Sequence, residues 1–318
     1  MDEPLGVLVV DKPEGPTSHD VVDHIRHLYG IKRVGHAGTL DPPATGVLVM
    51  GLGKATRLLN FLQGLPKRYL GRVRFGVSTT TQDAKGETVR EERCSFTAED
   101  LRRVAEGFIG EIAQIPPMVS AVRVGGKKLY ESARSGEEVD RQPRKVRIYA
   151  LEVTDIDLDK WEASIEVLCS SGTYVRTIAA DIGEQLNCGA HLSSLRRTAV
   201  GSFIEAEAVT LESLSAMDDG ERRARIIEPA MAMRDFPVVE VSDELETAVR
   251  HGRALDTDVL PARGGELPMV LENRRGDIAP HQAGMTAGIP VAVVDRSGKL
   301  LAVYRRSRHG LKPATVLV

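Results

Sequence analysis

The amino-terminal part of the chain begins with an apolar run and continues with apolar residues at helical spacing. The run Leu5–Val10 is soon followed by a proline, which predicts a short buried strand and then a break. Apolar positions recur every three or four residues across 21–29, after a capping Thr17 or Ser18 and before Gly30. This spacing predicts an amphipathic helix.

Two segments of opposite character follow the predicted helix. Residues 33–53 are rich in Gly, Thr, Pro and Ala, so they predict a loop rather than a regular element. Across 69–75 the residues Tyr69, Gly71, Val73 and Phe75 alternate with Leu70, Arg72 and Arg74. The alternation predicts a strand with one solvated face.

The middle of the chain mixes helical and strand patterns. A capping signature at Thr97 and Asp100 precedes apolar residues that continue to Ile109, which predicts a helix. Residues 146–158 and 163–169 alternate as two strands, and a helix with apolar positions at 178, 182 and 186 follows. Because the order lacks a regular βαβ rhythm, the pattern indicates an α+β fold.

The carboxy-terminal part is predicted to form a separate small domain. The chain becomes acidic and helix-prone after Glu205, and Phe236-Pro237 marks a domain boundary. Beyond it, 290–294 and 300–304 flank an Asp-Arg-Ser-Gly turn, which predicts a hairpin. We therefore expect domains at 1–236 and 237–318.

The net charge of the chain indicates no RNA-binding surface, but single segments do. The 42 Lys and Arg residues are offset by 45 Asp and Glu residues, so the net charge of −3 does not itself indicate a nucleic-acid partner. Residues 54–74 carry no acidic side chain and form the clearest basic stretch. A second basic segment, 123–147, is diluted by acidic residues, as in an ordinary solvated surface. The basic stretch contains Lys54, Arg57, Lys67, Arg68, Arg72 and Arg74.

Metal, disulfide and membrane functions find little support in the sequence. Cys94, Cys169 and Cys188 are too far apart for a zinc motif or a disulfide framework. His24 and His27 have no accompanying ligand set, and no apolar run approaches about 18 residues. We expect a cytoplasmic protein without metal or nucleotide cofactor.

Residues 33–48 gather small residues around one imidazole, His36, and one carboxylate, Asp41. Glycines in such a segment would let a substrate approach the backbone closely. An isolated Asp-Pro most often does no more than start a turn. A catalytic role for this carboxylate can therefore be inferred only from the segment around it.

That segment, GHAGTLDPPATGVL, resembles the central motif of the TruB family of pseudouridine synthases. The resemblance extends upstream to GVLVVDKPEGPTSHDVV and downstream through KRYLGRVRFGVSTTTQDAKGE, CSSGTYVRTIAADIG and HLSSLRRTAVG, in the family's order. It implies a pseudouridine synthase fold with a central mixed, largely antiparallel sheet flanked by helices, and a PUA-like carboxy-terminal domain. It also implies an insertion at about 118–147 that binds the T arm of transfer RNA.

The resemblance assigns roles to individual residues. It makes Asp41 the catalytic carboxylate, Tyr69 the ring that stacks on the uracil, and Arg176 a member of the catalytic set. Lys12 and Pro13 match a motif that supports the site. The resemblance also implies that His36, Tyr174 and Leu195 bind the substrate. The two basic segments add Lys67, Arg68, Lys127 and Lys128 as candidate substrate-binding residues, through contacts with RNA phosphates.

The implied reaction explains the need for these residue types. Pseudouridine forms when the bond between ribose C1′ and uracil N1 breaks, the base turns, and C5 bonds to C1′. An ionised carboxylate can attack the sugar or take its 2′ proton, and the sequence leaves both routes open. A buried carboxylate needs a cation to stay ionised, and Arg176 can supply two parallel hydrogen bonds.

The leading hypothesis is an isomerase that makes pseudouridine at position 55 of transfer RNA, as a monomer that needs no protein partner. The relative that uses guide RNAs is the nearest alternative. GGKKLYESARSGEEVDRQPRKV favours the stand-alone type, because the guide-dependent relative has a shorter connection there. An RNA-binding or RNA-folding factor and a glycoside hydrolase are further alternatives, although the sequence offers no second acid for the latter.

Overall fold

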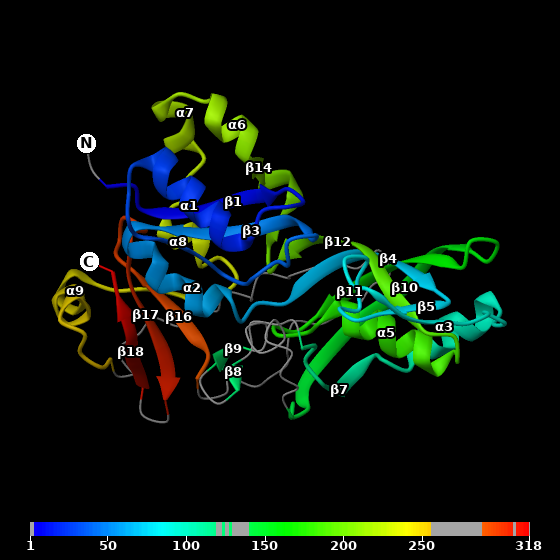
Figure 1. Ribbon diagram of the computed structural model, residues 1–318. Coiled ribbons are helices and arrows are strands. Elements are labelled where there is room, and N and C mark those ends of the chain that lie inside the picture. Colours follow the sequence, from blue (N-terminus) through cyan, green and yellow to red (C-terminus); the bar gives the residue numbers. More distant parts are fainter. Residues whose placement is uncertain are drawn as a thin grey trace. The chain divides into compact units, whose positions relative to one another are not determined.

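A computed structural model describes residues 3–118, 123–124, 127–128, 140–255, 288–307 and 310–317, with backbone alone at 123–124 and 127–128. The chain divides into two compact units, each built from separate stretches of sequence (Figure 1). The first comprises Met1–Leu40, Val47–Gln63 and Val200–Val318, and the second Asp41–Gly46 and Gly64–Ala199.

The first unit begins with the predicted strand and helix, both of which are confirmed. Strand β1 spans Gly6–Lys12, and helix α1 spans Ser18–Tyr29. Thr17 caps the helix through its side chain, which accepts a hydrogen bond from the backbone nitrogen of Asp20. Gly30 ends the helix in the left-handed conformation, with φ 62°.

The prediction that 33–53 forms a loop is wrong for two stretches. Val34–His36 form strand β2, which pairs antiparallel with strand β3, Thr45–Leu52. Val47–Met50 are completely buried, so the apolar run outweighs the many turn-forming residues around it. The glycines at the two ends of the run, Gly46 and Gly53, are the ones with positive φ.

Strand β1 joins the first unit's other strands around one apolar core. It pairs parallel with β14, Val209–Thr210, and lies next to β3 in the strand order. Apolar residues of α1, β1 and β3 pack together in this core. Shorter elements follow: η1 (Gly53–Leu58), α2 (Leu59–Leu62), β13 (Phe203–Ile204), η2 (Glu205–Glu207), α6 (Leu211–Ala216), α7 (Asp219–Ala224) and α8 (Pro229–Ala232).

The carboxy-terminal part of the first unit is a small sheet with its own apolar core. The described strands run in the order β15-β16-β17-β18, and the predicted hairpin is confirmed as β16 and β17. Helix α9 contacts β17 and β18. The domain boundary at 236 stays a prediction. The elements are β15 (Val238–Glu240), α9 (Asp243–Arg250), β16 (Pro290–Val294), β17 (Leu300–Ser307) and β18 (Gly310–Val316).

The second unit is built on a sheet with the strand order β12-β4-β11-β10-β7. Strand β4 shows the predicted alternation, and its neighbour β11 pairs with it antiparallel. Helix α3 contacts β10 and α5, and α5 contacts β4 (Figure 1). The bounds are β4 (Lys67–Phe75), α3 (Ala98–Glu106), β7 (Gly110–Gln114), β10 (Arg144–Asp157), β11 (Glu162–Cys169), α5 (Val175–Gln185) and β12 (Ala190–Val200).

Two short hairpins complete the second unit. β5 (Val77–Thr79) pairs with β6 (Thr88–Glu91), and β8 (Arg123–Val124) pairs with β9 (Lys127–Lys128). Most of the insertion expected at 118–147 lies outside the described residues.

The predicted fold class, α+β with a mixed sheet and a small carboxy-terminal sheet, is confirmed. Besides β2 and β3, two further elements differ from the prediction. The helix capped by Thr97 ends at Glu106 rather than continuing to Ile109, because the backbone nitrogens of 107–109 donate to carbonyls three residues back rather than four. The sequence pattern also did not predict β12. Within the described residues, no helix is long and apolar enough to cross a membrane.

Candidate active site

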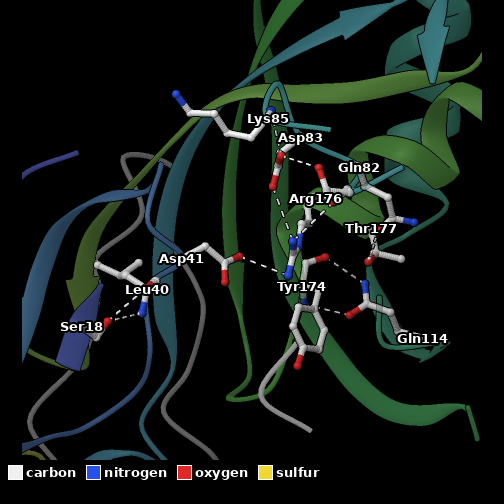
Figure 2. A network of polar contacts seen from close by, with 11 residues as sticks. Ser18, Leu40, Asp41, Gln82, Asp83, Lys85, Gln114, Tyr174, Arg176 and Thr177 are labelled. Atoms are coloured by element: carbon white, nitrogen blue, oxygen red, sulfur yellow. Dashed lines mark hydrogen bonds and ion pairs between the residues drawn. The ribbon is translucent and has the colours of Figure 1, made fainter. Parts of the chain in front are cut away.

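Asp41 occupies a short loop whose first end is held by buried hydrogen bonds. The backbone nitrogen of Leu40 donates to the Ser18 hydroxyl at 2.8 Å, and that hydroxyl donates to the Leu40 carbonyl at 3.0 Å (Figure 2). Asp41 itself closes a turn, because its carbonyl accepts from the Ala44 nitrogen at 3.0 Å. The carboxylate therefore follows directly after an anchored residue.

The other end of this loop is held by strand β12. Thr45 and Gly46 pair parallel with Arg196 and Arg197. Gly46 has φ 101°, and a Cβ there would lie 2.2 Å from the Arg197 carbonyl oxygen. Only glycine fits this close approach of two backbones.

Arg176 and Asp41 form an ion pair, as the sequence analysis expected. Nη2 of Arg176 lies 3.2 Å from Oδ2 of Asp41 (Figure 2). The arginine side chain is 5% exposed, whereas the aspartate side chain is 40% exposed. A carboxylate that meets a guanidinium in this way is stabilised in its ionised form.

A second carboxylate, Asp83, contacts the other side of the same guanidinium. Nη1 of Arg176 lies 3.5 Å from Oδ2 of Asp83 and 3.4 Å from the Thr81 carbonyl oxygen. Asp83 is itself fixed, because Oδ1 accepts from the Thr81 hydroxyl at 2.6 Å and from the Lys85 nitrogen at 3.0 Å. Sequence reasoning missed Asp83, although it lies in the quoted segment TTTQDAKGE.

Tyr174 stands beside Arg176 at the start of helix α5. Its backbone is clamped by Gln114, which accepts from the Tyr174 nitrogen at 2.8 Å and donates to its carbonyl at 3.0 Å. The Tyr174 ring centre lies 5.8 Å from the Arg176 guanidinium carbon. The structure thus brings together Asp41, Arg176 and Tyr174, which are far apart in sequence.

Tyr69 belongs to the same group of residues. It lies on the buried face of β4, is 9% exposed, and accepts a hydrogen bond from Arg197. Burial raises the pKa of Tyr69, the Arg197 charge opposes that rise, and the Asp41 charge adds to it. Leu195 lies near this face, since Cδ1 is 3.6 Å from the position a Cβ on Gly71 would take.

The expectation that Lys67 belongs to a basic surface is wrong. Lys67 is 5% exposed, and its ammonium group donates to the Leu65 carbonyl at 2.7 Å. Burial, followed by the charge of Arg197, lowers the pKa of Lys67 to about 7. Arg68 is partly buried and forms an ion pair with Glu166. Alternation along β4 explains the difference, because every second side chain points into the protein.

The remaining predicted residues belong to the first unit or have side chains that the structure does not describe. His36 is on β2 and Lys12 on β1, both in the first unit. Lys12 is completely buried and donates to the Pro13 carbonyl at 2.9 Å, which fits a supporting role. The side chains of Lys127 and Lys128 are not described. Among the described residues, no group of three or more His, Cys, Asp or Glu could hold a metal ion.

Solved structures with a similar fold cover nearly the whole chain. A structure titled a Cbf5-Nop10-Gar1 complex matches with a TM-score of 0.75 and 27% identity, over 99% of this chain and 85% of that chain. An H/ACA RNP bound to a substrate RNA containing 2'-deoxyuridine matches with a TM-score of 0.71 and 25% identity, over 99% and 86%. The pseudouridine synthase fold is confirmed.

Family and sequence comparisons are more specific. Residues 26–175 match the amino-terminal domain of the TruB family pseudouridylate synthases, and residues 176–233 match the tRNA pseudouridylate synthase B carboxy-terminal domain. The chain belongs to the TruB family.

Three relatives named tRNA pseudouridine synthase B illustrate the similarity. The Shouchella clausii protein is 42% identical over 89% of this chain and 95% of its own length. The Symbiobacterium thermophilum protein is 49% identical over 78% of this chain and 82% of its own. The Burkholderia pseudomallei protein is 40% identical over 98% and 97%.

Proposed function

We propose that this chain is a tRNA pseudouridine synthase, an isomerase that converts uridine 55 in the T loop of transfer RNA to pseudouridine. The observation that carries the proposal is the ion pair between Asp41 and Arg176, within the motif that the chain shares with the TruB family. Family membership supports a tRNA substrate, and the site supplies groups suited to breaking and remaking a glycosidic bond.

In the proposed reaction, Asp41 acts on the ribose of the target nucleotide. As a nucleophile, its carboxylate bonds to C1′ while the C1′–N1 bond breaks and the electron pair leaves with uracil. As a base, it instead takes the 2′ proton, which gives a glycal and the same leaving group. In the nucleophilic route C5 then bonds to C1′ as the bond between Asp41 and C1′ breaks, and in the glycal route C5 bonds to C1′ as Asp41 returns the proton to C2′. In both routes C5 loses its proton and N1 gains one. Arg176 keeps the carboxylate ionised in both.

The uracil must be held while it turns. A uridine in a folded loop has to leave the stack before an enzyme can reach C1′, at a cost of a few kcal/mol. Tyr69 is proposed to stack on the extruded base, with Tyr174 and Leu195 completing the pocket. Phosphate contacts offset that cost, and Arg68, His36, Lys127 and Lys128 are the proposed RNA-binding residues.

The test is a modification assay with the purified protein alone. An unmodified transfer RNA transcript is incubated with the protein, and pseudouridine is mapped by carbodiimide treatment and primer extension. We expect one modified position, residue 55, without any cofactor. A transcript with cytidine at that position is the matched control and should give no signal. Failure to modify the uridine transcript would overturn the proposal.

The guide-dependent alternative is distinguished in the same assay. Its support is the fold similarity to a Cbf5-containing complex. Product that formed only after a guide RNA and accessory proteins were added would favour that alternative. Action as a monomer without a protein partner, the PUA-like character of the carboxy-terminal sheet, and the cytoplasmic location stay predictions.

A further inference from the structure

Arg197 is a buried cation close to the proposed catalytic residues. It is 1% exposed and is the largest fully buried side chain in the described part of the chain. A guanidinium removed from water is costly unless its hydrogen bonds and charge are satisfied. Its presence in the interior therefore calls for a partner, and the Tyr69 hydroxyl is one, because it accepts a hydrogen bond from Arg197.

The strand arrangement explains how Arg197 reaches Tyr69. Strands β12 and β4 are neighbours in the sheet, and the Ser193 hydroxyl on β12 donates to the Arg72 carbonyl on β4 at 3.0 Å. Tyr69 lies on the buried face of β4. Lys67 lies on the same face, and the charge of Arg197 acts on it as well.

The backbone of Arg197 also holds the loop that carries Asp41. Gly46 pairs with Arg197, and its α-carbon approaches the Arg197 carbonyl too closely for any side chain. One residue thus contacts the proposed catalytic loop through its backbone and the proposed stacking ring through its side chain. Arg197 therefore connects the strand that carries Tyr69 with the loop that carries Asp41.

We infer that Arg197 is a positioning residue that orients Tyr69, by donating a hydrogen bond to the phenol oxygen. With that oxygen accepting from the guanidinium, the Tyr69 ring is held in one orientation and its own proton points away from Arg197. This inference rests on the proposed function, because it assigns Tyr69 to contact with the target base. In this role Arg197 acts through Tyr69 rather than through the substrate.

The inference is tested by a double-mutant cycle measured as single-turnover pseudouridine formation. The variants are Arg197→Gln, Tyr69→Phe and the two combined, with Arg102→Gln as control because Arg102 is a half-exposed arginine on α3. We expect Arg197→Gln to slow the reaction about 10- to 100-fold while tRNA affinity changes less than about threefold. In the Tyr69→Phe variant, Arg197→Gln should slow the reaction less than about twofold, because the phenol oxygen that accepts the hydrogen bond is already absent.

Two further readouts separate a positioning role from a general structural one. Arg197→Lys keeps a buried cation and should recover part of the lost rate. Ultraviolet titration, with Tyr69→Phe subtracted, should show that Arg197→Gln shifts ionisation of Tyr69 to higher pH, since the cation no longer stabilises the phenolate. If Arg197→Gln does not fold, the cycle and the titration are run with Arg197→Met, which is also uncharged.

Two results would overturn the inference. One is a double variant whose rate loss equals the product of the two single-variant losses. The other is a Tyr69 titration that is the same in wild type and in the variant without the Arg197 charge. Both require an active wild-type protein, so they are distinct from failure of the proposed function, in which the wild type itself makes no pseudouridine.

Discussion

Nη2 of Arg176 lies 3.2 Å from Oδ2 of Asp41, and the two partners differ sharply in exposure, at 5% for the arginine and 40% for the aspartate. The cation is thus buried and fixed, while the anion remains open to a substrate. A catalytic carboxylate has to meet both conditions, because it must stay ionised and must also reach the reacting atom.

Arg176 should not be replaceable by lysine, although lysine keeps the charge. Its two terminal nitrogens contact different carboxylates, Asp41 and Asp83, and an ammonium group cannot reproduce this planar geometry. We expect Arg176→Lys to reduce the single-turnover rate by about 100-fold or more, with tRNA affinity nearly unchanged. Tritium release from tRNA labelled at uracil C5 measures the rate. A variant within about threefold of wild type would show that the two-sided contact is dispensable.

Asp83→Asn should have a smaller effect in the same assay. The amide keeps hydrogen-bonding groups near Arg176 but removes one of its two negative neighbours. We expect a loss of about 10-fold, because the direct partner of Asp41 remains in place. A loss as large as that of Arg176→Lys would mean that Asp83 acts on the reaction independently.

Gly46→Ala should destabilise the protein through the backbone. The residue has φ 101°, and the added methyl would lie 2.2 Å from the Arg197 carbonyl oxygen. We expect the free energy of unfolding to fall by about 2 kcal/mol or more, from strain and from separation of the two strands. Denaturant unfolding measures it, with Gly15→Ala as control for the backbone strain, because Gly15 has a similar φ of 109° but a Cβ there meets no atom within 4 Å. Equal stability of the two variants would refute the predicted clash.

Lys67 should make stability depend on pH in the alkaline range. Its pKa falls from 10.5 to about 7 in the folded protein, so between these values the unfolded chain binds one more proton than the folded chain. The free energy of unfolding should therefore rise with pH there, by about 1.4 kcal/mol per unit from this group. Below pH 7 the lysine is charged in both states, and the folded protein bears the full cost of burying that charge.

Lys67→Met tests this pH dependence. The variant should lose the rise in stability between about pH 7 and 10 and should be more stable than wild type at pH 6. Lys54→Met, which removes an exposed lysine, serves as control. Parallel stability profiles for wild type and Lys67→Met would contradict the buried, shifted lysine.

Local patterns predicted local elements well but did not predict how distant segments meet. The capping boxes at Thr17 and Thr97 and the alternation of β4 depend on neighbouring residues, so they were readable directly. Strand β12 was missed because its polar stretch includes Arg197, which is buried only once the strand lies in the sheet beside β4. Lys67 was misplaced for the same reason, since a sequence-based charge count ignores which face a strand buries.

In the candidate site, too, some residues could be identified from the sequence and others only from contacts between distant segments. Asp41, Tyr69, Tyr174 and Arg176 came from the family resemblance, and the structure brings them together. Asp83 carried no distinguishing local signal, because its role depends on contact with Arg176. Only the folded chain shows that one guanidinium serves two carboxylates.

The most direct test of the account is the single-turnover rate of Asp41→Asn, measured together with its affinity for unmodified transfer RNA. The amide is close in size to the carboxylate but carries no charge and is not a nucleophile of comparable strength. We predict no detectable pseudouridine at position 55 and a dissociation constant within about threefold of wild type. Measurable turnover by a clean Asp41→Asn preparation would contradict the claim that this carboxylate carries the reaction.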